Sequence, residues 1–231
     1  MAVAGRVAAV AGLLLIASIA EIGVVAPQAP AAGNDQVARP ASAPAETVPA
    51  ETAPVLGDFD GDGRGDLLWY GPGAADDHLW LGRPSRNFAG VPVTVRGHYL
   101  PLGGDFDGDG RADVLWYGPG GAPDVLWRGR RGGRFAARTL AARGDYRPLV
   151  GDFDGDRRGD VLWYGPGPQP DVLWLGRPGG RFAARRLKVR GTYEPVLGDF
   201  DGDGRRDVLW YAPGAAADRV AAVVREVLDT A

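Results

Sequence analysis

The sequence of 231 residues has no cysteine, one methionine and two histidines. The absence of cysteine excludes disulfides, thiolate zinc sites and cysteine nucleophiles. Lys188 is the single lysine, so almost all basic residues are Arg. Together with the abundance of Ala, Gly and Pro, this is typical of a GC-rich bacterial genome. The formal net charge of −3 gives no electrostatic footprint for DNA or RNA, so we expect no nucleic-acid partner.

Groups that could form a catalytic centre are also scarce. His78 and His98 do not recur in the other repeats described below, and Ser85 has no evident triad partner. Glycosidase chemistry needs a carboxylic acid opposite a carboxylate, whereas Asp145 and Glu194 stand alone. The sequence therefore predicts that the protein is not an enzyme.

The N-terminus differs in character from the rest of the chain. Arg6 precedes an apolar run from Val7 to Ala20, which has the length of a signal-peptide core and is short for a membrane span. We expect a signal peptide over residues 1–31 and a secreted protein without a membrane span after cleavage; the alternative is an uncleaved anchor. Residues 32–54 are rich in Pro and Ala and predict a disordered linker.

A 47-residue repeat occupies most of the remaining chain. The pattern GDFDGDxRxDxLWYxPG begins at Gly57, Gly104, Gly151 and Gly198, and all seven Trp, seven Tyr and seven Phe fall within the repeat frame. Each full repeat holds four short strand candidates separated by Gly- and Pro-rich turns. Segments such as VLWY are apolar on both faces, which indicates strands covered on both sides. The sequence thus predicts an all-β, propeller-like array of four-stranded blades over residues 55–214, with aromatic side chains packed between blades.

Each repeat begins with an acidic loop of nine residues, in which Asp occupies positions 1, 3, 5 and 9. These carboxylates, the backbone carbonyl at position 7 and a water supply six or seven oxygens, which suits calcium better than the stricter octahedron of magnesium. A bound cation would also remove the repulsion between the carboxylates. The predicted ligands are Asp58, Asp60, Asp62, Arg64 and Asp66; Asp105, Asp107, Asp109, Arg111 and Asp113; Asp152, Asp154, Asp156, Arg158 and Asp160; and Asp199, Asp201, Asp203, Arg205 and Asp207.

A loop rich in Asp and Gly can also be a simple turn, but a turn needs one or two such residues rather than four carboxylates in each of four copies. We therefore expect up to four calcium ions. The Asp152–Asp160 loop should bind most weakly, because Arg157 stands where the other loops have glycine. Arg157 must adopt a backbone geometry that glycine adopts freely, and it brings a positive charge near the ion.

The motif DFDGDGRxD followed by DVLWY resembles the FG-GAP/VCBS repeat, the calcium-loop blade of integrin α-subunit propellers and of many secreted bacterial proteins. The Trp-rich form is also similar to repeats of fungal and bacterial propeller lectins. The resemblance covers residues 55 to about 214 and implies an extracellular, calcium-stabilised β-propeller with a binding or adhesive role. The fold alone does not identify a ligand.

The fourth repeat is incomplete and stops at Arg219. In the tail 215–231, an apolar stripe that begins at Val220, with Asp218 as a plausible N-cap, predicts a short helix. Three and a half blades leave three alternatives: a monomeric arc capped by the helix, a homodimer that completes a ring of seven, or a truncated gene product. Two functions remain open. One is a calcium-dependent module that binds a glycan or an extracellular protein. The other is a structural or accessory propeller, or the truncated remnant of a larger exported protein, with no ligand of its own.

Overall fold

The computed structural model of the chain describes residues 54–211, except 74, 120, 121, 188 and 190, and the backbone of 219–221. Every element within these residues is a β-strand. A search of the same residues finds no helix with the length and hydropathy of a membrane span. The predicted signal peptide and the predicted linker up to residue 53 lie outside the described residues.

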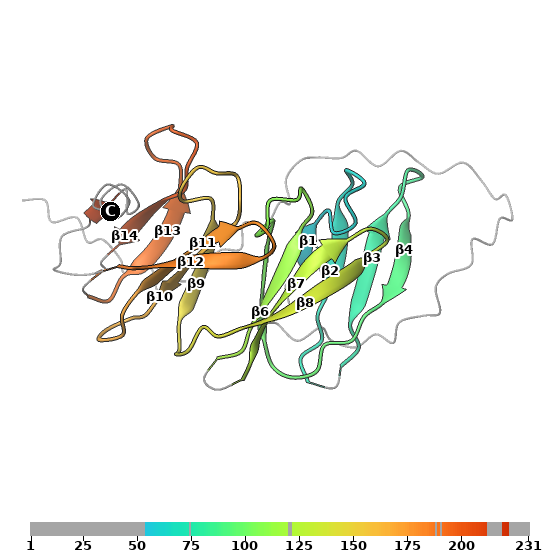
Figure 1. Cartoon of the computed structure of the whole chain (residues 1–231), viewed down its shortest axis with the longest axis horizontal. Coiled ribbons are helices and arrows are strands. Elements are labelled where there is room, and N and C mark those ends of the chain that lie inside the picture. The colour runs from blue at the N-terminus through green and yellow to red at the C-terminus, as the bar shows by residue number, and fades with distance from the viewer. Residues whose placement is uncertain are drawn as a thin grey trace, which may run out of the picture. The chain divides into compact units, whose positions relative to one another are not determined.

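The described strands form four antiparallel sheets that follow one another along the chain (Figure 1). The first three sheets have four strands in sequential order, and the fourth has three. Their bounds are β1 (Val55–Gly57), β2 (Asp66–Trp69), β3 (His78–Gly82) and β4 (Phe88–Pro92); β5 (Leu100–Gly104), β6 (Asp113–Tyr117), β7 (Asp124–Arg130) and β8 (Arg134–Leu140); β9 (Arg147–Gly151), β10 (Asp160–Tyr164), β11 (Val172–Arg177) and β12 (Arg181–Arg186); β13 (Glu194–Gly198), β14 (Asp207–Tyr211) and β15 (Arg219–Ala221).

The second strand of each sheet explains why the repeat folds as predicted. Every residue of β6 and of β10 is buried, as expected for DVLWY segments that are apolar on both faces. The register also repeats, because Val114 pairs with Trp127 in the second sheet and Val161 pairs with Trp174 in the third. The prediction of an all-β array of four-stranded repeats is thus confirmed.

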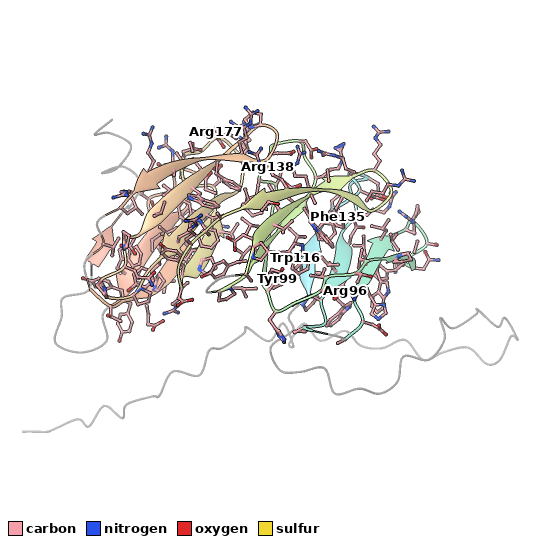
Figure 2. The ribbon with its side chains drawn as sticks, turned by 60° about the horizontal axis from the view of Figure 1, so that its bottom comes forward. Arg96, Tyr99, Trp116, Phe135, Arg138 and Arg177 are labelled. Carbon is pink, nitrogen blue, oxygen red and sulfur yellow. The ribbon has the colours of Figure 1, made fainter. Side chains whose placement is uncertain are left out.

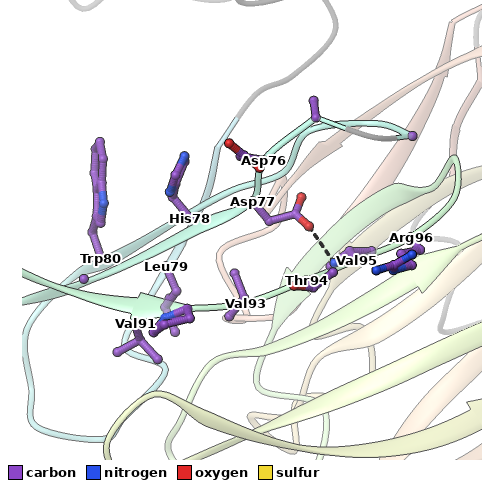
Figure 3. A pocket seen from close by; sticks show the side chains of 14 residues that line it. Asp76, Asp77, His78, Leu79, Trp80, Val91, Val93, Thr94, Val95 and Arg96 are labelled. Atoms are coloured by element: carbon purple, nitrogen blue, oxygen red, sulfur yellow. Dashed lines mark hydrogen bonds between the residues drawn. The ribbon is translucent and has the colours of Figure 1, made fainter. Parts of the chain in front are cut away.

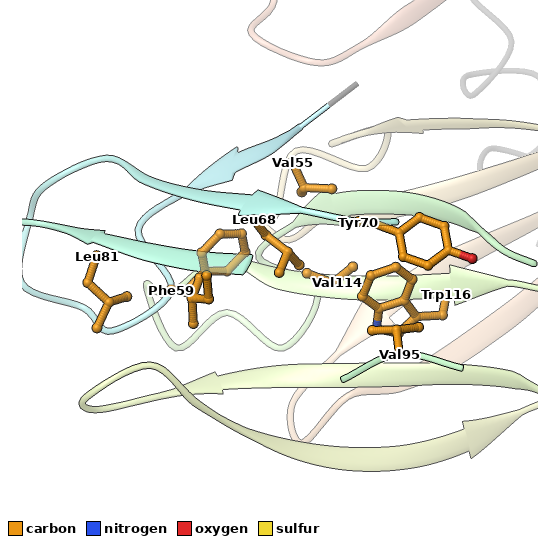
Figure 4. Close-up of a cluster of buried hydrophobic side chains, with 9 residues drawn as sticks. Val55, Phe59, Leu68, Tyr70, Leu81, Val95, Val114 and Trp116 are labelled. Carbon is orange, nitrogen blue, oxygen red and sulfur yellow. The ribbon is translucent and has the colours of Figure 1, made fainter. Parts of the chain in front are cut away.

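The apolar core lies between consecutive sheets. One cluster joins Phe59, Leu68 and Tyr70 of the first sheet to Val114 and Trp116 of the second, as Figure 4 shows. Two further clusters join the second sheet to the third and the third to the fourth in the same way. The prediction that aromatic side chains pack between repeats is therefore confirmed, and each sheet depends on its neighbour for burial of its faces.

The predicted C-terminal helix is wrong for residues 219–221, which form strand β15. This strand pairs with β14, with Leu209 opposite Val220. The edge of β14 offers backbone hydrogen bonds to an extended segment, and this tertiary pairing overrides the helical spacing of the apolar residues. Asp218 and residues 222–231 lie outside the described residues.

Candidate metal centre

The first aspartate of each loop holds the turn closed. In the first loop, Asp58 Oδ1 accepts hydrogen bonds from the N–H groups of Gly61 (2.7 Å) and Asp62 (3.1 Å), and Oδ2 accepts from Gly63 (2.7 Å). Both glycines have positive φ, +77° and +83°, which turns their N–H groups inward at no steric cost. The sequence therefore folds the loop around its own first carboxylate.

The last aspartate of the loop connects it to the next hairpin. Asp66 is buried, and its two oxygens accept hydrogen bonds from the N–H groups of Phe59 and Gly82, both at 2.8 Å. Asp113 and Asp160 have the same two partners in their own repeats. Burial raises the pKa of Asp113 and of Asp160 to about 7, although these backbone donors favour the charged form. A carboxylate this costly to ionise is one that a nearby cation would stabilise.

The structure brings three carboxylates together in each of the four loops. Their oxygens lie within 4.8 Å of one another. Positions 1, 3 and 5 converge in the first and fourth loops, whereas positions 1, 3 and 9 converge in the second and third. The four clusters are Asp58, Asp60 and Asp62; Asp105, Asp107 and Asp113; Asp152, Asp154 and Asp160; and Asp199, Asp201 and Asp203. The ligand role of the backbone carbonyl at position 7 stays a prediction.

An arginine from the following hairpin contacts aspartates of each of the first three acidic loops. Arg83 Nη1 lies 3.4 Å from Asp60 Oδ2, and Arg130 Nη1 lies 2.9 Å from Asp109 Oδ2. Arg177 Nη1 contacts both Asp154 (3.1 Å) and Asp156 (2.9 Å). The sequence analysis missed these counter-charges, although arginine recurs at the 47-residue spacing directly after each LWxG motif.

One observation tests whether these residues fit a cation. Asp60 is buried, and its Oδ1 atom has no hydrogen-bond partner in the part of the chain that the structure describes. A buried, unsatisfied carboxylate oxygen is expensive, so its position in a cluster of carboxylates fits a bound ion. The donor set consists entirely of oxygen, which selects a hard cation rather than zinc or copper.

The third loop keeps its shape despite the residue at position 6. Arg157 has a φ of +65°, within the left-handed region predicted from the sequence, and its N–H donates to Asp152 Oδ2 at 2.8 Å. In the second loop, Gly110 makes the corresponding bond to Asp105 at 2.9 Å. The hydrogen bond from position 6 to the first aspartate is therefore kept in both loops, and the two loops differ there in backbone strain and in charge.

Apart from the acidic loops, a hollow of about 890 Å³ lies on the first sheet between β3, β4 and the segment that follows β4 (Figure 3). The His78 and Trp80 rings stack on its rim, with centroids 6.2 Å apart. Asp77 accepts hydrogen bonds from the N–H groups of Gly71 and Val95, as Asp124 does from the corresponding residues in the next repeat. Asp77 is thus a structural acceptor, and the hollow contains no nucleophile paired with a base.

The comparisons agree with this architecture. The model of the FG-GAP-like repeat matches residues 105–163 and 152–210. Among solved structures, the chain is similar to a lectin of Agrocybe aegerita described for its specific recognition of non-reducing terminal N-acetylglucosamine, with a TM-score of 0.55 and 19% identity. The match covers 68% of this chain and 46% of that chain, so this chain spans just under half the length of the lectin. No curated protein matches the sequence.

Proposed function

The chain belongs to the FG-GAP repeat family, and from this premise we propose that it is a secreted, calcium-binding module that binds an extracellular ligand without catalysing a reaction. The ligand is a glycan or an extracellular protein. The calcium ions fix the acidic loops and thereby hold the sheets that present the binding surface.

The observation that carries the calcium proposal is the buried Asp60 Oδ1 atom, which lacks a hydrogen-bond partner within the described residues. The cluster around it is repeated in all four loops. A divalent cation would satisfy this oxygen and offset the desolvation that raises the pKa of Asp66, Asp113 and Asp160. Calcium is favoured over magnesium because it accepts the irregular cage that a nine-residue loop can offer.

The glycan proposal is supported by the lectin, which has the same fold, and by an aromatic surface. Trp80 is 38% exposed and stacks with His78 beside the hollow. Aromatic residues of this kind are enriched at binding surfaces. A role without catalysis is supported by the contacts of the clustered carboxylates, which bond to loop N–H groups and to arginines.

Calorimetric titration with calcium, followed by a glycan array with and without chelator, tests the proposal. We expect saturable calcium binding and glycan binding that chelation abolishes. Absence of calcium binding would overturn the metal assignment. Calcium binding without any glycan or protein ligand would favour the second candidate, a structural or accessory propeller.

The second candidate is favoured by the burial of three of the seven tryptophans. Trp116, Trp163 and Trp210 are at most 3% exposed and pack between sheets, where they cannot contact a ligand. Under this alternative the calcium loops serve stability alone.

A further inference from the structure

Each of the three contacts between consecutive sheets follows one aromatic pattern. Trp116 of the second sheet packs on Tyr70 and on Tyr99, which precedes β5, with ring centroids 5.0 and 6.2 Å apart; Figure 2 labels Tyr99 and Trp116. At the next two contacts, 47 and 94 residues further along the chain, Trp163 packs on Tyr117 and Tyr146, and Trp210 packs on Tyr164 and Tyr193. We call the face that a sheet turns toward the preceding sheet its leading face, and the opposite face its trailing face. At each contact, a tryptophan on the leading face of one sheet thus packs on a tyrosine of the sheet before it and on a second tyrosine directly before the first strand of its own sheet.

The acidic loops are joined by a second repeated pattern. The Ala112 N–H donates to the backbone carbonyl of Asp58 at 2.7 Å, and equivalent bonds join Gly159 to Asp105 and Arg206 to Asp152. The side chain of Arg111 lies against Gly61, and Arg158 and Arg205 lie in the same way against the next two loops. Each of the first three loops is therefore covered by the loop that follows it.

The leading face of the first sheet has no sheet against it within the described residues. Leu56 is 70% exposed and Phe88 is 56% exposed, and Trp80 lies open beside them. Their counterparts in the second and third sheets, which include Trp127, Phe135, Trp174 and Phe182, are packed against the preceding sheet. The first sheet thus has, at the same positions, the residues through which the second and third sheets contact the sheet before them, and here these side chains are exposed.

The trailing face of the fourth sheet is uncovered as well. Phe200 is 50% exposed and Tyr211 is 47% exposed, whereas their counterparts Phe153 and Tyr164 are fully buried. No atom lies within 4 Å of a methyl group placed on Gly202, while the glycines at this position in the other three loops each lie against an arginine. The fourth acidic cluster is also the one whose three carboxylates are all exposed.

We propose that the leading face of the first sheet in one copy of this chain docks on the trailing face of the fourth sheet in a second copy. In this contact Trp69 takes the place of Trp116 and packs on Tyr211 of the other copy. Phe88 packs on Phe200, as Phe135 packs on Phe59 within the chain (5.7 Å, edge to face). Arg64, with its side chain 42% exposed, supplies the missing arginine over Gly202, where it faces the exposed acidic loop. The two faces therefore carry the residues of the internal contacts, and Arg64 is opposite in charge to the fourth acidic loop.

The proposed contact is heterologous, since two different faces of the same chain meet. Each copy offers one of each face, so two copies form two equivalent contacts when the rotation closes. Trp80, which supports the glycan proposal, lies on this face, so docking of a second copy and glycan binding at Trp80 would exclude each other. The inference rests on the internal contacts between sheets and not on the identity of the ligand.

The test measures the molar mass of the purified full chain in millimolar calcium, by size-exclusion chromatography with light scattering. We expect the wild type at twice the monomer mass. Phe88→Glu and Phe200→Glu each place a charge in the contact, so each variant alone should elute as a monomer. Because each variant keeps one intact face, an equimolar mixture of the two should again contain a dimer, joined through a single contact.

Leu100→Glu is the matched control. Leu100 is 45% exposed, and the repeat already has charged residues, Arg147 and Glu194, at the equivalent positions. This variant should keep the mass of the wild type. A monomeric wild type would overturn the proposal, as would Phe88→Glu and Phe200→Glu variants with the wild-type mass. A mixture that stays monomeric would exclude a head-to-tail contact.

Discussion

The second and third acidic loops share the backbone hydrogen bonds that positions 4 and 6 donate to the first aspartate, but they differ in charge and strain. Gly110 and Arg157 both donate an N–H to the first aspartate of their loop, and both have positive φ. In the second loop, Arg130 and Arg128 contact one carboxylate each, whereas in the third loop Arg177 contacts both equivalent carboxylates. This comparison indicates that the hydrogen bonds to the first aspartate determine the shape of the loop. The residue at position 6 determines the conformational free energy that the loop needs to adopt that shape.

Two properties of Arg157 make the third loop less favourable for a bound cation. A residue with a side chain in the left-handed region is disfavoured by about 1–2 kcal/mol. The guanidinium of Arg157 also adds positive charge close to a cluster that is proposed to bind a cation. Both effects should weaken calcium binding at the third loop relative to the second.

Removal of calcium should have the largest effect and should abolish the difference in metal binding between the two loops. Extracellular calcium sites bind at about 10⁻⁴–10⁻³ M, and a site at a hundredfold excess of ligand adds about 2.7 kcal/mol to the free energy of unfolding. Several sites together should therefore raise the melting temperature markedly in millimolar calcium relative to EDTA. Differential scanning calorimetry measures the change, and magnesium at equal concentration is the control. Equal melting temperatures with calcium and with EDTA would contradict the metal assignment.

Alanine at position 5 should separate the two loops directly. Asp109→Ala should remove more calcium-dependent stability than Asp156→Ala, because the third loop contributes less at the start. We expect a difference of about 1.4 kcal/mol, which corresponds to about a tenfold difference in affinity. Chemical denaturation of both variants, with calcium and with EDTA, provides the measurement. Equal calcium-dependent losses in the two variants would disprove the ranking.

An exchange of the residues at position 6 should reverse the comparison. Arg157→Gly should strengthen calcium binding at the third loop by up to about tenfold, because it removes both the backbone strain and the nearby charge. Gly110→Arg should weaken the second loop by a similar factor. Calorimetric titration of the two variants and of the double variant resolves the effect. Tighter binding in Gly110→Arg would mean that the guanidinium does not oppose the ion.

Loss of the arginine that faces the carboxylates should give the smallest effect. Arg177→Gln should lower the stability of the calcium-free protein by less than about 1 kcal/mol, because pairs this exposed are screened by water. The same change should modestly tighten calcium binding, since Arg177 competes for the oxygens of Asp154 and Asp156. Arg130→Gln, which removes a contact to one carboxylate, should do less. Weaker calcium binding in Arg177→Gln would show that the arginine supports the site.

The repeat made most of the fold predictable. Strand positions, burial of DVLWY and the packing of Trp116 between sheets follow from residues that are close in sequence and recur every 47 positions. The left-handed backbone of Arg157 was predictable for the same reason, because three glycines occupy the equivalent position.

Contacts between distant residues were not predictable. Asp66 accepts a hydrogen bond from Gly82, 16 residues away, and Arg177 reaches Asp156 from 21 residues away. Only the pairing of the second and third strands brings these groups together. Strand β15 was missed because the edge of β14 selects an extended partner, a preference that helical spacing does not reveal.

The hydrogen bonds between consecutive loops have a mechanical consequence. In addition to the apolar clusters between sheets, one carbonyl of each of the first three acidic loops accepts a hydrogen bond from the loop that follows it, so each repeat is attached to its neighbours along the chain. When the chain is pulled from its ends, each repeat that unfolds releases 47 residues, about 160 Å of extended polypeptide. If calcium stabilises the acidic loops, its concentration sets the force at which each extension step of this length occurs.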